Sequence, residues 1–308
     1  MPFFSVIIPL FNKELFIEAT LKSVLNQSYT DFEVIIVNDG STDNSAQIIT
    51  KFDDARIRFF TKDNAGASAA RNYGIEKAQS NYISFIDADD YWYPTFLEEI
   101  FEKVNRFPDI KVFSAAIEIE TSKTIFPAHY SIKKTGDFEI VNYFSASTKE
   151  TVICTSCAVF NKSIFEDVGV FDTQIKSGQD TDMWIRIGLK YDVLFIWKIL
   201  ARYVYDENSL SKNKNYLDTK VDFSKFAENE KTNPELKKFL DLNRFSLAIK
   251  HKIAGNKSLF ENCYNDIDLK KLALKKRVLL LLPAFILKLL IATKTALTNN
   301  GVGSSVFK

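Results

Sequence analysis

Two carboxylates follow a short apolar run near residue 85. Residues 82–90 read Tyr-Ile-Ser-Phe-Ile-Asp-Ala-Asp-Asp, so Asp87 and Asp89 come directly after the apolar residues. Because side chains alternate along an extended chain, the two carboxylates emerge on the same side. Paired carboxylates suit a hard divalent cation that also holds substrate phosphates, whereas burying them without a partner would be costly. A solvated acidic turn is the simpler interpretation of a lone Asp-x-Asp, so the surrounding elements have to decide.

The first 90 residues alternate between apolar runs and segments with helical apolar spacing. The predicted strands are 3–10, 32–38, 57–61 and 82–86, and the predicted helices are 14–27, 46–52 and 66–78. Apolar strands that alternate with helices are typical of a parallel sheet covered on both faces. In such sheets ligands bind beyond the carboxyl ends of the strands.

Polar residues gather at these predicted strand ends. They are Asn12 and Glu14 after the first strand, Asp39 after the second, Asn64 after the third, and Asp87 and Asp89 after the fourth. A sheet with a purely structural role would not need this pattern, and we expect the side chains to lie along one edge.

Four segments resemble the successive signatures of the inverting glycosyltransferase family 2. They are 5–12 (Ser-Val-Ile-Ile-Pro-Leu-Phe-Asn), 37–43 (Val-Asn-Asp-Gly-Ser-Thr-Asp), 64–74 (Asn-Ala-Gly-Ala-Ser-Ala-Ala-Arg-Asn-Tyr-Gly) and 85–90 (Phe-Ile-Asp-Ala-Asp-Asp). The resemblance covers roughly residues 3–205 and implies a GT-A fold, an αβα sandwich with a mostly parallel central sheet. It places the catalytic domain at 1–210, with a nucleotide-binding half at about 1–90 and an acceptor-side half at about 91–210.

The resemblance also implies roles for individual residues. Pro9, Phe11 and Glu14 would line the nucleoside, and Asp39 would accept a hydrogen bond from the imide N–H of uracil. Asn64, Arg71 and Ala88 would face the nucleotide. Asp87 would reach the ribose and the metal, and Asp89 would bind Mn²⁺ or Mg²⁺ directly.

Three of these residues also have structural interpretations. Glu14 fits a first-turn charge favoured by the helix dipole. Asn64 fits a turn, and Arg71 fits a surface ion pair.

A further segment supplies a candidate base. Residues 177–189 read Ser-Gly-Gln-Asp-Thr-Asp-Met-Trp-Ile-Arg-Ile-Gly-Leu, which is similar to the family segment in which Gly-Glu-Asp precedes a helix with Trp and Arg. The resemblance makes Asp180 the general base, and Gln179 stands where the family has Glu. Asp180 also fits a helix N-cap, and Asp182 is the alternative base.

The implied reaction moves a hexosyl or N-acetylhexosaminyl group from a nucleotide sugar, with UDP expected, to a glycan or lipid-linked hydroxyl, as in bacterial surface-glycan synthesis. A metal would stabilise the leaving diphosphate and Asp180 would accept the acceptor's proton. Two other classes stay open. Gln179 leaves room for an inactive sugar-nucleotide-binding scaffold. A metal-dependent nucleotidyltransferase would need a phosphate-cradling glycine loop, which the sequence lacks.

Composition favours an intracellular enzyme. The 308 residues are 46% hydrophobic, enough for one large domain and an appendage. Three cysteines are too few for a disulfide framework. Cys154 and Cys157 lie in a predicted strand, 151–160, and without a second pair they indicate buried thiols rather than zinc. No secretory signal is recognised at the N-terminus, so we expect a cytoplasmic location.

The remaining residues, 211–308, are predicted to be a helical extension. A polar linker is expected near 205–215, followed by helices at 216–230, 234–254 and 269–297, with Asn233 as an N-cap before Pro234. Residues 269–308 hold eight Lys or Arg and no acid, whereas the other 268 residues hold 32 basic and all 39 acidic residues.

The apolar run at 278–287 is ten residues long, too short for a bilayer, which needs about 20. A basic, apolar tail fits an interfacial anchor on anionic lipid, peripheral on the inner membrane face. A helix docked on the catalytic domain and a homo-oligomer contact fit equally well. Nucleic acid is not expected, because no binding motif accompanies the basic run.

Overall fold

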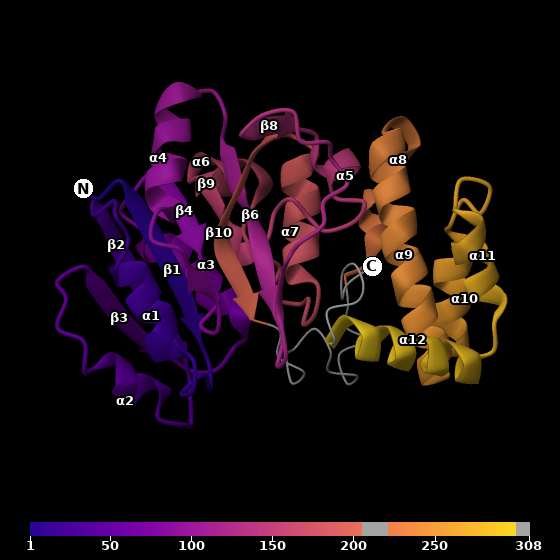
Figure 1. Cartoon of the computed structure of the whole chain (residues 1–308), viewed down its shortest axis with the longest axis horizontal. Coiled ribbons are helices and arrows are strands. Elements are labelled where there is room, and N and C mark those ends of the chain that lie inside the picture. The colour runs from indigo at the N-terminus through magenta and orange to yellow at the C-terminus, as the bar shows by residue number, and fades with distance from the viewer. Residues whose placement is uncertain (205–220, 300–308) are drawn as a thin grey trace.

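The computed structural model describes residues 1–204 and 221–299, without the side chains of 295–299. Within these ranges one ten-stranded sheet has the order β3-β2-β1-β4-β9-β6-β10-β5, with β7 paired to β6 and β8 to β10 (Figure 1). The strands are β1 (Phe4–Leu10), β2 (Phe32–Asp39), β3 (Ile57–Lys62), β4 (Tyr82–Phe85), β5 (Tyr91–Trp92), β6 (Val112–Glu120), β7 (Ile125–Pro127), β8 (Phe138–Val141), β9 (Ala158–Asn161) and β10 (Val193–Val204).

The N-terminal half of the sheet is parallel, as predicted. β2 pairs in parallel with β1 and β3, and β4 pairs in parallel with β1. The helices of the first two thirds of the chain are α1 (Ile17–Leu25), α2 (Ser45–Ile49), α3 (Ala67–Lys77), α4 (Phe96–Arg106), α5 (Tyr143–Ala146), α6 (Ser163–Val168) and α7 (Gln179–Gly188). α1 begins three residues later than expected, because the N–H groups of Lys13 and Glu14 bind the side chains of Ser45 and Asp43 instead.

The second half of the sheet mixes directions. β9 pairs antiparallel with β4 and β6, whereas β10 runs parallel to β6. The predicted strand 151–160 is wrong over most of its length: residues Thr155–Cys157 form a 3₁₀ helix, η1, and β9 begins only at Ala158. Ser156 explains the bend, because its side chain and carbonyl bind the segment that follows β4. Cys157 is buried and Cys154 is half-buried, both as free thiols.

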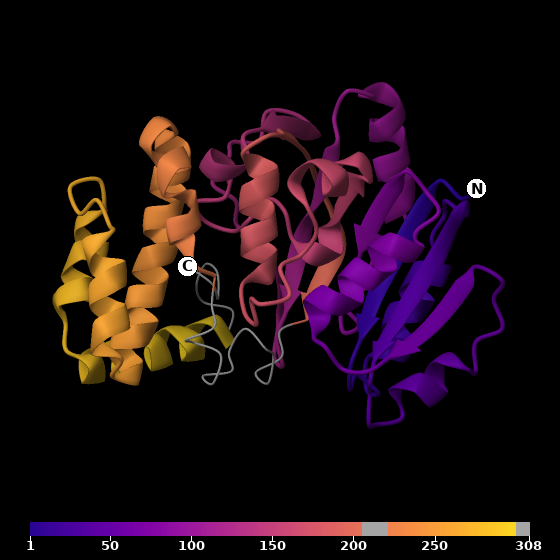
Figure 2. The same cartoon turned by 180° about the vertical axis from the view of Figure 1, so that it is seen from behind.

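Alternate strand residues divide between two cores, as a covered sheet requires. Ile7 and Ile35 pack with residues of α3 and α7 on one face. Val6 and Val34 pack with residues of α1 and α4 on the other face. These layers confirm the α/β sandwich, and Figure 2 views the face that α7 covers.

Helices follow the sheet. They are the 3₁₀ helix η4 (Phe223–Phe226), α8 (Ala227–Thr232), α9 (Pro234–Ala254), α10 (Lys257–Asn265), α11 (Leu274–Leu281) and α12 (Ala284–Asn299). α9 packs on α5, where the ring of Phe239 lies 5.3 Å from that of Tyr143 between centroids. Asn233 caps α9 as predicted, accepting the N–H of Leu236 at 3.0 Å.

Two predictions for this region are wrong. The helix expected at 269–297 is broken between α11 and α12, because Pro283 cannot continue a helix. Residues 257–265, for which no helix was predicted, form α10. The predicted linker and the start of the helix at 216–230 lie outside the described residues. In the ranges that the structure does describe, no helix combines the length and apolar character needed to cross a membrane.

Candidate active site

The acidic turn after β4 brings its carboxylates to two cations. Asp87 accepts a hydrogen bond from Arg71 Nη2 at 2.5 Å, and Asp89 accepts one from Lys13 Nζ at 2.5 Å. Burial raises the pKa of Asp89, and the nearby charge of Asp87 adds to the effect. The side chains of Asp87 and Asp89 are only 32% and 15% exposed. They are therefore not the solvated turn of the simpler interpretation.

Asp90 holds this turn in place and was not predicted as a site residue. It is buried, and its carboxylate accepts hydrogen bonds from the N–H of Val204 at 2.9 Å and the hydroxyl of Ser156 at 2.5 Å. The same Ser156 oxygen accepts the N–H of Asp87. Burial, then the charges of Asp89 and Asp87, raise the pKa of Asp90 well above its usual range. The third Asp of the run was the available sequence signal.

Asp39, at the end of β2, organises the loop that enters α3. Its buried carboxylate accepts the N–H groups of Ala65 at 3.1 Å and Gly66 at 2.7 Å and the Lys62 ammonium at 2.5 Å. A carboxylate has about four acceptor positions, so these donors leave room for about one more. The side chain of Asn64 donates to the Asp39 carbonyl at 2.9 Å and serves the same loop.

The end of β1 and the residues after it form a partly exposed rim. Pro9, still within β1, is half-buried, and Phe11, just after β1, is 45% exposed. Glu14 precedes α1, so its interpretation as a first-turn helix charge is wrong. Its carboxylate instead accepts the backbone N–H and the side-chain amide of Asn44 at 2.9 and 2.8 Å, which ties the rim to the loop after β2.

Arg71 lies on α3 and is buried, so its interpretation as a surface ion pair is wrong. Besides its bond to Asp87, the guanidinium lies 5.5 Å from the ring centroid of Phe171. Its Nε and Nη1 have no hydrogen-bond partner among the described residues. Buried donors of this kind are nearly always satisfied by protein, water or ligand. Ala88 is buried, and its backbone carbonyl accepts a hydrogen bond from the hydroxyl of Thr20. Its methyl side chain can offer a ligand no polar group.

Asp180 lies in the first turn of α7. The N-cap is Gly178, at φ +86°, so the N-cap alternative for Asp180 is wrong. Asp180 is half-buried and accepts the N–H of Thr181 at 2.7 Å. In Figure 1 the arrowheads of β1 and β10 point to the lower edge of the sheet, and α7 begins on that same side. The first turn of α7, which contains Asp180, therefore lies on the side of the strand ends.

Asp182, the alternative base, has a different environment. Its side chain is fully buried, accepts a hydrogen bond from Arg186 Nε at 3.0 Å and pairs with Lys225. Arg186 in turn donates to the carbonyls of Val168 and Val170. Asp182 thus joins α7 to the loop before it and to η4, and a substrate cannot reach it.

No group of three or more His, Cys, Asp or Glu side chains is arranged to hold a metal in residues 1–204 and 221–299. The acidic turn nevertheless offers the carboxylate oxygens of two residues, Asp87 and Asp89, which here bind Arg71 and Lys13. This donor set fits a divalent ion that completes its shell with diphosphate and water oxygens rather than with protein groups alone.

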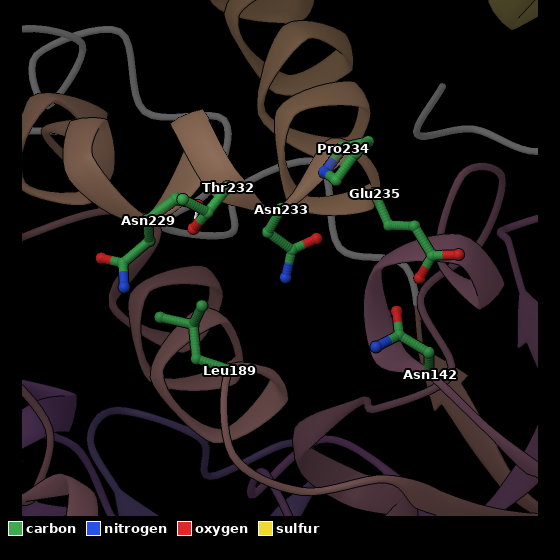
Figure 3. Close-up of a pocket in the computed structure, with 7 residues that line it drawn as sticks. All are labelled: Asn142, Leu189, Asn229, Thr232, Asn233, Pro234 and Glu235. Atoms are coloured by element: carbon green, nitrogen blue, oxygen red, sulfur yellow. Dashed lines mark hydrogen bonds between the residues drawn. The ribbon is translucent and has the colours of Figure 1, made fainter.

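A polar cavity of about 650 Å³ lies elsewhere, where α7 ends against α5 and the start of α9 (Figure 3). Its lining residues are Asn142, Leu189, Asn229, Thr232, Asn233, Pro234 and Glu235. None of the predicted site residues is among them.

The family model for glycosyl transferase family 2 matches residues 5–169, more than half of the chain and including the acidic turn. The chain belongs to glycosyltransferase family 2. Asp39, Arg71, Asp87 and Asp89 all lie within the matched region, whereas Asp180 lies beyond it.

Relatives support this membership over parts of the chain. An uncharacterized glycosyltransferase of Haemophilus influenzae is 48% identical over 94 residues, 30% of this chain and 38% of that protein. Glycosyltransferase GlyA of Streptococcus pneumoniae is 39% identical over 102 residues, 32% of this chain and 15% of that protein. The chain thus spans well under half the length of these two relatives. RT0329 of Rickettsia typhi is 28% identical over 225 residues, 70% of this chain and 69% of that protein.

Solved structures share the fold. S. aureus TarS 1–349 in complex with UDP-GlcNAc superposes with a TM-score of 0.60 at 16% identity, covering 85% of this chain and 89% of that one. The TarS complex with UDP gives 0.57 over 86% and 87%. The GT-A-like fold of this family 2 member is therefore confirmed.

Proposed function

We propose that this family 2 protein is an inverting glycosyltransferase that moves a sugar from a UDP-sugar to a hydroxyl of a glycan or lipid-linked acceptor. One observation carries the proposal: the buried guanidinium of Arg71 binds Asp87 in the acidic turn, and two of its nitrogens have no hydrogen-bond partner among the described residues. A donor sugar nucleotide offers phosphate and ribose oxygens for the guanidinium and, with a metal ion, for the carboxylates. The UDP and UDP-GlcNAc complexes of TarS motivate UDP as the carrier.

The base of the nucleotide would lie between the ends of β1 and β2. Asp39 keeps about one acceptor position for the imide N–H of uracil, and its other bonds hold the carboxylate still. The exposed ring of Phe11 would cover the nucleoside. A fixed acceptor loses little entropy on binding, which favours affinity.

Asp89 and Asp87 would hold Mn²⁺ or Mg²⁺, which as a Lewis acid stabilises the negative charge of a departing diphosphate. Lys13 and Arg71 already place positive charge on these carboxylates. They would also attract the anionic donor into the edge of the sheet.

Asp180 would accept the proton of the acceptor hydroxyl. The first turn of α7 has two acidic side chains, and Asp180 is the half-buried one, whereas Asp182 is fully buried. A single base and a single displacement invert the anomeric carbon without an enzyme-bound sugar. Because Gln179 stands beside Asp180 where the family has Glu, the competing proposal is a protein that binds a sugar nucleotide without catalysing transfer. We place the reaction at the inner face of the cell membrane.

The test is a panel of sugar nucleotides, measured for binding and for slow hydrolysis with Mn²⁺, with Mg²⁺ and with chelator. We expect metal-dependent hydrolysis of at least one UDP-sugar, abolished in Asp89→Asn and retained in Asp109→Asn, a matched change at an exposed position. Binding without hydrolysis or transfer would indicate a scaffold. Failure of every sugar nucleotide to bind would refute the proposal.

A further inference from the structure

α11 and α12 expose apolar side chains at helical spacing. On α11, Leu274, Val278 and Leu281 are 48–72% exposed and recur at i, i+4 and i+7. Their neighbour Leu280, on the opposite side of the helix, is buried and packs in the cluster formed with α9. This outward row, the α11 stripe, is therefore separate from the face that holds the helix on the protein.

α12 also exposes apolar side chains, and beyond Leu287 they lie on more than one face, because Leu290 and Ile291 are 45% and 46% exposed. Phe285 and Leu289 are 72% and 67% exposed, and Ala292 continues the same row at i+7. Leu287, on the opposite side, is buried. We call the outward row the α12 stripe. Patches of this kind on an otherwise polar surface mark interaction sites.

Basic residues lie beside both stripes. Lys275 and Arg277 are exposed next to the α11 stripe, and Lys288 is exposed next to the α12 stripe. Residues 269–308 contain no acid, so these basic residues have no acidic neighbour within α11 or α12. An apolar row edged by cations matches a bilayer whose surface is anionic.

The position of α12 relates this surface to the catalytic edge. In Figures 1 and 2 α12 runs along the lower edge of the molecule, the edge to which the arrowheads of β1 and β10 point. α12 therefore lies on the same side of the molecule as the carboxyl ends of these strands.

We infer that the α11 and α12 stripes form an interfacial surface that binds anionic lipid bilayers. A second copy of the chain fits less well, because a two-fold contact through this face would bring like charges together. Membrane binding itself stands on these exposed residues alone. Its consequence, that a lipid-linked acceptor is held close to the catalytic domain, rests on the proposed function.

The test is co-sedimentation of the full-length protein with vesicles of phosphatidylcholine, with and without the anionic lipid phosphatidylglycerol, in the absence of donor. Phe285→Ser/Leu289→Ser should reduce partitioning by about 100-fold or more, because two large side chains no longer enter the lipid. The matched control is Ile125→Ser/Ile140→Ser, which removes two exposed apolar side chains elsewhere and should bind like the wild type.

The charge arm uses Lys275→Gln/Arg277→Gln, with an expected loss of roughly fivefold per charge. Its control, Lys51→Gln/Lys190→Gln, makes the same change in net charge at exposed positions outside α11 and α12. Added salt should weaken the charge contribution and leave the apolar one.

Thermal unfolding and sugar-nucleotide hydrolysis in solution accompany each variant, so a failure of membrane binding is distinguishable from a failure of the proposed function. The inference is overturned if the wild type stays in the supernatant with anionic vesicles at low salt. It is also overturned if the stripe variant binds like its control, or if sedimentation velocity shows self-association that the stripe variant abolishes.

Discussion

The two carboxylates in the first turn of α7 should separate stability from catalysis. We consider Asp180→Asn and Asp182→Asn, which make the same chemical change two residues apart. Each substitution removes a negative charge and preserves the shape of the side chain. The structure predicts opposite consequences for the two.

Asp182→Asn should destabilise the fold. It leaves Arg186 and Lys225 facing a neutral, fully buried group, and breaking a buried ion pair typically costs about 3–5 kcal/mol. Since the side chains of Arg186 and Lys225 are 20% and 37% exposed and can recover water, we expect the lower end, about 3 kcal/mol. At about 2 °C per kcal/mol for a large domain, Tm should fall by about 6 °C.

Asp180→Asn should leave the fold nearly unchanged. Among the described residues, the Asp180 carboxylate accepts the N–H of Thr181, and an amide oxygen can accept that bond as well. The cost should stay below about 1 kcal/mol. Transfer, however, should fall by about 10²–10⁴-fold, the usual contribution of a general base, while the affinity for the UDP-sugar is retained.

The assay combines thermal unfolding by circular dichroism, donor binding by calorimetry and the transfer rate measured well below the lower Tm. A wild-type transfer rate in Asp180→Asn would refute the assignment of the base. So would an Asp182→Asn protein that keeps the wild-type Tm and loses transfer.

Three further predictions concern the loops that would carry the proposed donor site. Gly40→Ala should cost about 2 kcal/mol, because Gly40 has φ +73° and the added Cβ would lie 2.9 Å from the backbone nitrogen of Asn64. Gly66→Ala should cost a similar amount, about 2 kcal/mol, because Gly66 lies in open space but at φ +91° and ψ 165°, a region essentially restricted to glycine; an unchanged stability of either variant in urea unfolding would contradict this reasoning. Burial acts to raise the pKa of Asp43, but the hydrogen bonds its carboxylate accepts outweigh burial and lower it. Asp43→Asn should therefore cost about 1 kcal/mol at neutral pH, and the cost should shrink as the pH falls through the lowered pKa of Asp43 and the wild-type carboxylate is protonated; a cost that does not change in acid would count against this reasoning. Asp39→Ala should weaken UDP more than inorganic diphosphate in calorimetry, and an equal loss for both would assign the effect to the loop alone.

The positions of the site residues along the chain could be predicted, because strand and helix periodicity are local properties. Apolar runs followed by polar residues placed Asp39, Asn64 and the acidic turn at strand ends, and the parallel pairing of β1 with β2 and β4 brings those ends to one edge. Asn233 and the bounds of α9 followed from capping chemistry in the same way.

The partners of these residues could not be predicted, because they come from distant parts of the chain. Asp90 binds the N–H of Val204, 114 residues away, and Asp87 binds Ser156, 69 residues away. The strand predicted over 151–160 failed for this reason, since tertiary hydrogen bonds to the acidic turn outweigh the β-propensity of Thr, Val and Ile.

The sequence by itself determined which elements form and where their polar ends fall, since both depend on residues a few positions apart. Only the tertiary structure decided which carboxylates a substrate can reach. Asp180 and Asp182 share one helical turn and one residue type, yet Lys225 from η4 and Arg186 enclose the second and leave the first half-exposed. Burial depends on what packs against a turn, and that is fixed only when the whole chain has folded.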